Sequence, residues 1–173
     1  MIIRELTIAE MDSCVPRLAA ILMNAVDAEA GVSFLSPLSK DVAEAFWIKQ
    51  VPDIGKEATT LFVAETDGKI AGTVMLQKAW APNQPHRCEV AKLLVHTDFR
   101  KRGIGTKLMQ ALEGRARKLG FTLITFDTVA HGSVEKFYHD LGFTLVGYIP
   151  DYAMTTKGGL HDTALFYKKL TRP

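Results

Sequence analysis

The chain has 173 residues, of which 47% are hydrophobic and 23% charged, so its length and composition are those of one globular domain. This balance excludes a disordered, collagen-like or coiled-coil protein, and a net charge of +2 is too small for a dedicated nucleic-acid binder. The sequence holds no apolar run near the ~18 residues that a membrane-spanning helix needs. We therefore expect a single domain over residues 1–173, with neither a nucleic-acid nor a membrane partner.

Cysteine and histidine usage gives no sign of a metal centre. Cys14 and Cys88 are the only cysteines, and they form neither a CxxC pair nor a His-x-Cys cluster. Two isolated thiols are typical of a reducing compartment. The opening residues also lack the charged-then-apolar layout of a signal peptide, so we expect a cytoplasmic protein without a metal.

The first third of the chain reads as one strand and two helices. Met1–Leu6 is rich in β-formers, and Thr7 followed by Glu10 has the spacing of a helix capping box. A helix is then predicted up to Gly31, with Pro16 kinking or dividing it. Its apolar face consists of Leu18, Ile21, Leu22, Ala25 and Val26.

A second helix is expected from about Ser39 until just before Gly55. The loop between the helices, residues 31–38, is apolar and contains Phe34. Loops and helix ends of this kind often form small-molecule sites, so Phe34 and Trp47 could contribute to a substrate pocket.

From residue 60 the pattern changes to strands. Asp67-Gly68 is a strong hairpin signal between two β-rich segments, Thr60–Glu65 and Lys69–Gln77, and Cys88–Val95 follows as the third strand of a meander. The remaining elements are predicted as a helix over Gly103–Leu119, a strand over Phe121–Phe126, a helix over Ser133–Leu141, and strands over Phe143–Pro150 and Thr163–Leu170. This order predicts an α/β chain in which an antiparallel meander crosses over to a parallel neighbour.

The most specific segment is Arg100-Lys101-Arg102-Gly103-Ile104-Gly105-Thr106, between a strand and a long helix. Two glycines one residue apart let the backbone approach a bulky anion, and the N–H groups at the start of a helix point at such an anion. The spacing fits neither a Walker A loop nor a dinucleotide fingerprint. On the residues alone, the glycines could equally serve only a tight turn with solvated basic residues before it.

This loop and a second motif, F-Y-H-D-L-G-F over Phe137–Phe143, resemble the GCN5-related N-acetyltransferase (GNAT) family. The resemblance covers the whole chain in element order. It implies a mixed, mostly antiparallel central sheet of about seven strands flanked by about four helices. It also implies that acetyl-CoA binds with its pyrophosphate at the R-x-x-G-x-G loop and its thioester beside the second motif. One departure is His131, which stands where many members carry an asparagine.

The resemblance assigns a set of cofactor-binding residues on the central strand, the glycine loop and the second motif's helix. They are Leu93, Leu94, Val95, Arg100, Lys101, Arg102, Gly103, Ile104, Gly105, Thr106, His131, Ser133 and Lys136.

Further segments look like the tabtoxin resistance acetyltransferase branch of that family. These segments are Gly31–Phe34, Arg87–Leu93, Phe126–Thr128, Gly132–Val134 and Phe137-Tyr138. In that branch the proposed catalytic groups are an acidic residue of the fourth strand, an aspartate after the fifth strand and a helix tyrosine. Carried over, these roles fall on Glu89, Asp127 and Tyr138.

The chemistry of amine acetylation fits these three side chains. An amine with a pKa near ~10 must lose a proton before it attacks a thioester, and a carboxylate, directly or through water, can accept that proton. Tyr138 could protonate the departing thiolate. The structural alternatives are solvent-exposed acids for Glu89 and Asp127, a helix cap for Asp127, and a core tyrosine with a wet hydroxyl for Tyr138.

We therefore expect an acetyl-CoA-dependent N-acetyltransferase that moves an acetyl group directly to a primary amine of a small, amino-acid-like metabolite or toxin. The alternatives are acetylation of a protein N-terminus or lysine, and a non-catalytic acyl-CoA-binding sensory domain. The sequence leaves the oligomeric state open, although in relatives the last two strands of this fold often mediate dimers, so a homodimer is one candidate.

Overall fold

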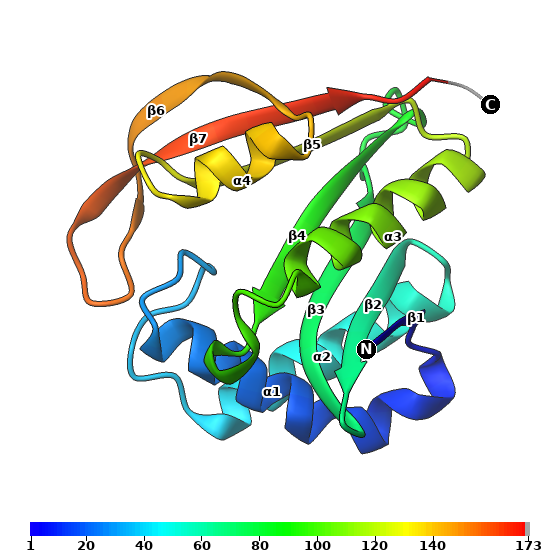
Figure 1. Cartoon of the computed structure of the whole chain (residues 1–173), viewed down its shortest axis with the longest axis vertical. Coiled ribbons are helices and arrows are strands. Elements are labelled where there is room, and N and C mark those ends of the chain that lie inside the picture. Colours follow the sequence, from blue (N-terminus) through cyan, green and yellow to red (C-terminus); the bar gives the residue numbers. More distant parts are fainter. Residues whose placement is uncertain (172–173) are drawn as a thin grey trace.

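The computed structural model describes residues 1–171 as one seven-stranded sheet covered by helices on both faces (Figure 1). The sheet order is β1-β2-β3-β4-β5-β7-β6. The elements are β1 (Ile2–Glu5), η1 (Ile8–Glu10), α1 (Met11–Asp27), α2 (Lys40–Gly55), β2 (Thr59–Thr66), β3 (Lys69–Lys78), β4 (Arg87–Val95), η2 (Thr97–Phe99), α3 (Ile104–Lys118), β5 (Leu123–Val129), α4 (Val134–Asp140), β6 (Thr144–Met154) and β7 (Leu160–Lys169).

The predicted meander and crossover are confirmed. β2, β3 and β4 pair antiparallel in sequence order, and the turn between the first two uses left-handed conformations at Asp67 and Gly68. α3 then connects β4 to β5, which is its parallel neighbour. β6 and β7 complete the sheet as an antiparallel hairpin, so the predicted fold class is correct.

Two apolar cores lie on the two faces of the sheet, and the alternation of β2 shows why. Leu61 and Val63 pack with α1 and α2, whereas Phe62 and Ala64 pack with α3 and α4. Side chains of a strand point alternately to opposite faces, so one strand contributes to both cores. The first helix contributes its predicted face, and Leu18, Ile21 and Leu22 are fully buried.

The first helix differs from its prediction at two points. Pro16 does not divide it, because α1 continues through this residue, which lies near the helix start and removes one backbone hydrogen bond. The helix also ends at Asp27 rather than near Gly31. Glu29 adopts a left-handed φ of 59°, and the N–H groups of Glu29 and Ala30 donate to the carbonyls of Val26 and Ala25. These bonds form a Schellman motif with glutamate in the position usually taken by glycine.

The fifth strand is shifted relative to its prediction, with consequences for the site. It covers Leu123–Val129 instead of Phe121–Phe126, because residues up to Val129 pair with β7. Asp127 therefore lies inside the strand. The last two strands are also longer than predicted, at Thr144–Met154 and Leu160–Lys169.

β4 and β5 pair along only part of their lengths. The parallel register covers Arg87–Glu89 opposite Leu123–Thr125 and then stops. Beyond it, β4 carries a bulge at Lys92, whose φ is 49°, and the buried Thr73 hydroxyl donates to the Lys92 carbonyl at 2.9 Å. β5 meanwhile follows β7. The two strands separate, and Figure 1 shows them opening toward α4 on one side and the loop after α1 on the other.

Candidate active site

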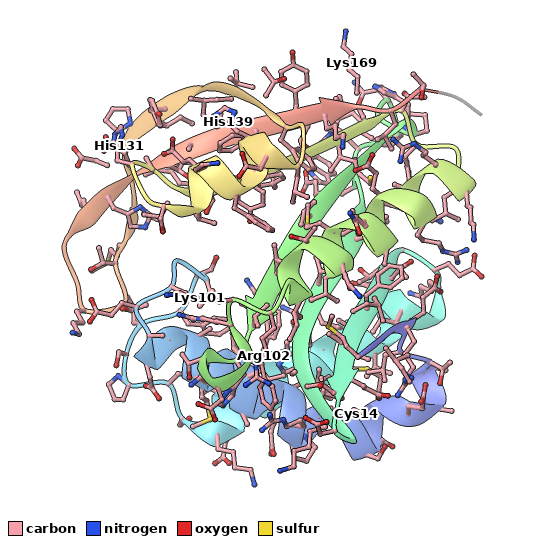
Figure 2. The ribbon with its side chains drawn as sticks, viewed as in Figure 1. Cys14, Lys101, Arg102, His131, His139 and Lys169 are labelled. Atoms are coloured by element: carbon pink, nitrogen blue, oxygen red, sulfur yellow. The ribbon has the colours of Figure 1, made fainter. Side chains whose placement is uncertain are left out.

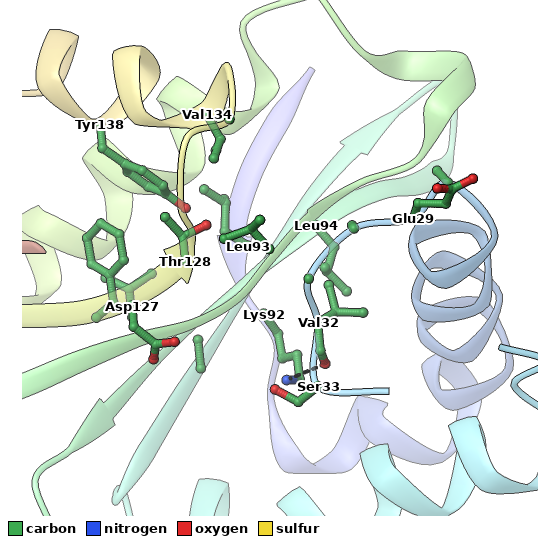
Figure 3. Close-up of a pocket in the computed structure, with 18 of the residues that line it drawn as sticks. Glu29, Val32, Ser33, Lys92, Leu93, Leu94, Asp127, Thr128, Val134 and Tyr138 are labelled. Atoms are coloured by element: carbon green, nitrogen blue, oxygen red, sulfur yellow. Dashed lines mark hydrogen bonds between the residues drawn. The ribbon is translucent and has the colours of Figure 1, made fainter. Parts of the chain in front are cut away.

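A cavity of about 540 Å³ occupies the place where β4 and β5 separate. Its walls are Val90–Leu94 of β4, Phe126–Val129 of β5, the loop Ala28–Ser33 after α1, and the start of α4 with Tyr138 (Figure 3). Three stretches far apart in the sequence, residues 28–33, 90–94 and 126–138, therefore form most of one cavity. A cavity of this size can enclose a small molecule together with the reactive end of a cofactor.

Tyr138 lines this cavity and is held by an aromatic cluster. Its ring is 4.4 Å from the ring of Phe126 and 5.6 Å from that of Phe166, between centroids, and the residue is 6% exposed. Figure 3 shows its hydroxyl end beside Thr128, within the cavity. Burial, with a smaller contribution from the charge of Asp127, raises the pKa of Tyr138. The phenol therefore keeps its proton at neutral pH and can act as a donor.

Asp127 also lines the cavity, and its side chain is exposed there. One of its carboxylate oxygens accepts a hydrogen bond from the hydroxyl of Thr163 at 3.0 Å, across the β5–β7 pair. The helix-cap alternative is wrong, because Ser133 occupies the N-cap position of α4. Asp127 is thus a carboxylate held in the sheet with one oxygen oriented by a neighbour.

Glu89 lies outside the cavity lining among the described residues. It sits on the paired part of β4, opposite Thr125, and its carboxylate forms an ion pair with Arg87 at 2.5 Å. Arg87 also donates to Thr125 at 2.7 Å and to Gln84 at 2.6 Å. The geometry thus brings Asp127 and Tyr138 together at the cavity and leaves Glu89 in a separate polar network.

A second cavity, of about 320 Å³, lies at the start of α3. Gly103 has a φ of 73°, with nothing within 4 Å of the position where a Cβ would stand. The first N–H groups of a helix find no acceptor inside it, and here Lys107 is the first residue to bond back, to the Gly103 carbonyl at 3.1 Å. The preceding N–H groups can therefore bind a phosphate, so this turn fits the pyrophosphate of acetyl-CoA. The predicted residues that line it are Val95, Arg100, Lys101, Gly103, Ile104, Gly105 and Thr106.

The three basic residues of the loop differ in their placement. Arg100 borders both cavities and donates through Nε to the Val95 carbonyl at 3.2 Å. Lys101 lines the second cavity with a left-handed φ of 61°. Arg102 lies outside both sets of lining residues described here: its guanidinium covers the ring of Phe99 at 5.4 Å and donates to the Asp98 carbonyl (Figure 2). Arg102 thus supports the loop from its outer side.

Gly105 joins the two sequence motifs physically. A Cβ at this position would stand 3.3 Å from Cζ of Phe137, the residue before Tyr138. Phe137 also lines the second cavity. The missing side chain of Gly105 therefore lets α3 pack closely against α4, a packing role that the anion-binding interpretation did not include.

Leu93, Leu94 and Ser133 of the predicted cofactor set line the first cavity, whereas His131 and Lys136 do not. The His131 ring packs against the Tyr148 ring, with 4.5 Å between centroids and a tilt of 38°, and His131 lies at the outer edge of the molecule (Figure 2). Lys136 is 80% exposed and pairs with Asp140. Their side chains are engaged with other parts of the protein.

Several residues that line the first cavity were not predicted as site residues, and the two most informative are Lys92 and Gly31. Lys92 is a lysine in a strand of mostly apolar residues, which was the available signal. Gly31 faces β5 so closely that a Cβ would be 2.1 Å from Cγ2 of Val129. No local pattern predicts that contact, because it depends on the distance between two remote segments. Neither of the predicted pocket residues Phe34 and Trp47 is among the described residues that line this cavity: Trp47 is fully buried in the core, and Phe34 is partly buried and packs against that core.

Within residues 1–171, no helix has both the length and the apolarity to cross a membrane. In the same part of the chain, no three His, Cys, Asp or Glu side chains gather as a metal site requires.

Comparison with known proteins places this geometry in a family. Residues 22–143, more than half of the chain, match the model of the acetyltransferase (GNAT) family. An uncharacterized N-acetyltransferase encoded in the hisH-hisA intergenic region of Azospirillum brasilense is 31% identical over 108 residues, which are 60% of this chain and 61% of that protein. The chain spans about a third to three-fifths of the length of the first curated relatives it matches.

Solved structures agree on the fold. The ribosomal-protein-alanine N-acetyltransferase of Brucella melitensis superposes with a TM-score of 0.80 at 20% identity, over 98% of this chain and 100% of that one. The putative acetyltransferase yncA of Salmonella typhimurium, solved with its cofactor acetyl-CoA, has a TM-score of 0.79 at 19% identity, over 100% and 95% of the two chains. With the glycine loop, the divided strands and the family match in agreement, the chain belongs to the GNAT acetyltransferase family.

Proposed function

We propose that this protein is an acetyl-CoA-dependent N-acetyltransferase that acetylates the primary amine of a small, amino-acid-like molecule. The observation that carries the proposal is the pair of neighbouring cavities on β4, with Arg100 bordering both. One has the backbone of a phosphate-binding helix start. The other holds a carboxylate and a buried phenol. A cofactor that extends from the first cavity to the second would present its thioester beside Asp127 and Tyr138.

Each side chain has a distinct task in the proposed mechanism. Asp127, directly or through water, accepts the proton that the ammonium must lose before attack. A backbone N–H of Leu93–Val95, in the part of β4 that does not pair with β5, would donate to the oxyanion of the tetrahedral intermediate. Tyr138 gives its proton to the departing sulfur. Bound acetyl-CoA supplies the activated acetyl group.

The raised pKa of Tyr138 constrains the last step. A thiol has a pKa near ~8.5, below that of even an unperturbed phenol, so a free thiolate would not take this proton efficiently. Transfer must accompany cleavage of the C–S bond, when negative charge is developing on sulfur in a poorly solvated cavity. Desolvation there also raises the proton affinity of the sulfur.

Direct transfer, without an acetylated enzyme, is supported by the state of the cysteines. A nucleophilic cysteine needs an accessible thiolate. Cys88 is fully buried, and burial raises its pKa to about 12. Cys14 is on α1, outside the residues that line the cavity in the described chain. Acetyl-CoA and the amine would therefore bind together.

The small-molecule acceptor is supported by the size of the cavity and by the resemblance of its residues to the tabtoxin resistance branch. Val32, Lys92, Asp127, Ser133 and Tyr138 of that resemblance all line the cavity. GNAT enzymes as a family act on small molecules or on proteins, so a protein N-terminus or lysine is the competing acceptor. The cytoplasmic location and the homodimer stay predictions.

The test is to incubate the protein with acetyl-CoA and separate panels of small amines, amino acids and short peptides. Thiol release and N-acetylated products are measured in the same mixtures. We expect equal amounts of free thiol and N-acetylated small molecule. Acetylation of peptides only would move the function to the protein acceptors. Binding of acetyl-CoA without any thiol release would instead favour a non-catalytic sensory domain.

A further inference from the structure

Four charged side chains line the first cavity, and one of them has no task in the proposed mechanism. Glu29 forms an ion pair with Lys157, and Arg100 donates to the β4 backbone. Asp127 is the proposed base. Lys92 remains. It is partly buried at the β4 bulge, where the strand leaves its pairing with β5.

The surroundings of Lys92 leave its ammonium group incompletely satisfied. Nζ donates to the Val32 carbonyl at 3.0 Å (Figure 3) and lies 5.7 Å and 5.3 Å from the ring centroids of Phe34 and Phe46. An ammonium has three donors, and this is the single hydrogen bond that the described residues provide. None of their carboxylates forms an ion pair with it. The aromatic rings favour the charged form without neutralising it.

A partly buried cation without a counter-ion is unusual. Burial disfavours its charge, which lowers the pKa of Lys92, while the charge of Asp127 acts in the opposite direction without forming an ion pair with it among the described residues. A bound anion would supply the missing counter-charge for the Lys92 ammonium. The place open to that anion is the cavity, because Lys92 and the adjoining loop residues Val32 and Ser33 all line it.

The cavity therefore has two oppositely charged sides. Asp127 on β5 offers a carboxylate to an ammonium group, and Lys92 on β4 offers an ammonium to an acid (Figure 3). Resting on the proposed N-acetyltransferase function, we propose that Lys92 binds the carboxylate of the acceptor, so that the enzyme selects amino acids over amines without an acidic group. A polyamine would instead bring a second cation to Lys92, and a lysine within a protein would bring an uncharged backbone amide.

Two matched probes isolate this interaction: L-amino acids and their carboxamides, which share the side chain and differ in the acidic group. Because an amide also lowers the pKa of the neighbouring amine, kcat/KM is expressed per concentration of free amine for both probes. Thiol release from acetyl-CoA is measured for both with the wild type, Lys92→Met and Lys49→Met. Methionine keeps the length and apolar contacts of Lys92 while removing its charge. Lys49 is an exposed lysine of α2 outside the cavity, so its variant controls for the loss of one positive charge.

We expect the wild type and Lys49→Met to prefer an amino acid over its carboxamide by roughly 10–100-fold in kcat/KM, the usual range for a hydrogen bond between charged groups. Lys92→Met should lose this preference through a higher KM for the acid, with kcat for the carboxamide unchanged. A merely structural lysine would affect both probes equally. Lysine acting as the base would lower kcat for both.

Equal kcat/KM for acid and carboxamide in the wild type would overturn the assignment while leaving the N-acetyltransferase function intact. That comparison needs no variant, so it stands even if Lys92→Met fails to fold. An equal loss of kcat/KM with both probes in a folded Lys92→Met protein that still binds acetyl-CoA would also overturn the assignment. If the proposed N-acetyltransferase function itself is wrong, free thiol would not be released from acetyl-CoA with either probe or with any other amine.

Discussion

The two cavities are built in opposite ways. The one at the start of α3 is made by residues close together in the sequence, within Val95–Thr106, with Phe137 beside them, and the groups proposed to bind acetyl-CoA there are mainly backbone N–H groups. The one between β4 and β5 is made by side chains from the loop after α1, two strands and α4. A backbone site recognises a shape common to every CoA ester. A side-chain site can change its specificity one residue at a time.

The largest effect should come from the phenol in the side-chain cavity. Tyr138→Phe keeps the ring within its aromatic cluster and removes only the proton donor. We expect kcat to fall roughly 10²–10⁴-fold, with acetyl-CoA affinity measured by calorimetry nearly unchanged. A variant that keeps most of its turnover would show that water protonates the sulfur, leaving Tyr138 a packing role.

The next effect separates the two carboxylates. Asp127→Asn should lower kcat/KM about 10²-fold at neutral pH and recover in part at high pH, where the free amine is abundant without a base. Glu89→Gln is the comparison variant, because that carboxylate lies outside the cavity lining and pairs with Arg87. Its charge can only attract the ammonium substrate from a distance, so we expect a modest rise in the KM for the amine, with kcat retained. A pH-dependent loss confined to Glu89→Gln would exchange the two roles.

A smaller effect is expected in the backbone-built cavity. Gly103→Ala forces a left-handed conformation on a residue with a Cβ, at a cost of about 1–2 kcal/mol. If the loop of Gly103→Ala relaxes to an unstrained conformation, acetyl-CoA binding must return it to the left-handed one. We therefore expect the affinity for acetyl-CoA to weaken roughly tenfold. Gly158→Ala carries the same type of strain, at a φ of 91° in the β6–β7 turn. That control should lose stability in thermal unfolding without losing acetyl-CoA affinity. Equal acetyl-CoA affinity in folded wild type and Gly103→Ala would contradict the loop assignment.

The smallest effect concerns the distance between two walls of the side-chain cavity. Gly31→Ala puts a Cβ against Val129, which can respond by changing its rotamer or by moving β5 outward. We expect a few-fold increase in the KM for the amine, without a change in acetyl-CoA affinity. Adding Val129→Ala to Gly31→Ala should bring the KM for the amine back toward that of the wild type. Steady-state kinetics of the two single variants and the double variant measure the coupling between the two positions. No coupling between the substitutions would mean that the two walls adjust independently.

The difference between the cavities also explains what could be predicted from sequence. Arg100 to Thr106 are adjacent, so their spacing predicted a glycine turn at a helix start, with anion binding or tight packing as its purpose; the resemblance to the GNAT family favoured the first. The meander was equally local, since Asp67-Gly68 specifies its turn. The order of elements resembled a known family, and the sheet topology followed from it.

The rest depended on long-range geometry. Asp127 was placed after its strand because nothing in Phe121–Val129 reveals how far β7 extends the pairing. Glu89 and Asp127 were both candidates for the base, and the end of the β4–β5 pairing, which leaves Asp127 at the cavity and Glu89 outside it, separates them. Lys92 went unassigned as a site residue because its role follows from the bulge and from Val32, sixty residues away in the chain.

The most direct test of the central claim is the initial-velocity pattern with acetyl-CoA and an accepted amine both varied. In the proposed mechanism the two adjoining cavities are filled together and the buried, protonated Cys88 takes no part, so both substrates must be bound before transfer. Double-reciprocal plots should therefore intersect, and the protein incubated with acetyl-CoA alone should keep its unmodified mass. Parallel lines together with an acetylated protein would contradict direct transfer and require a covalent nucleophile.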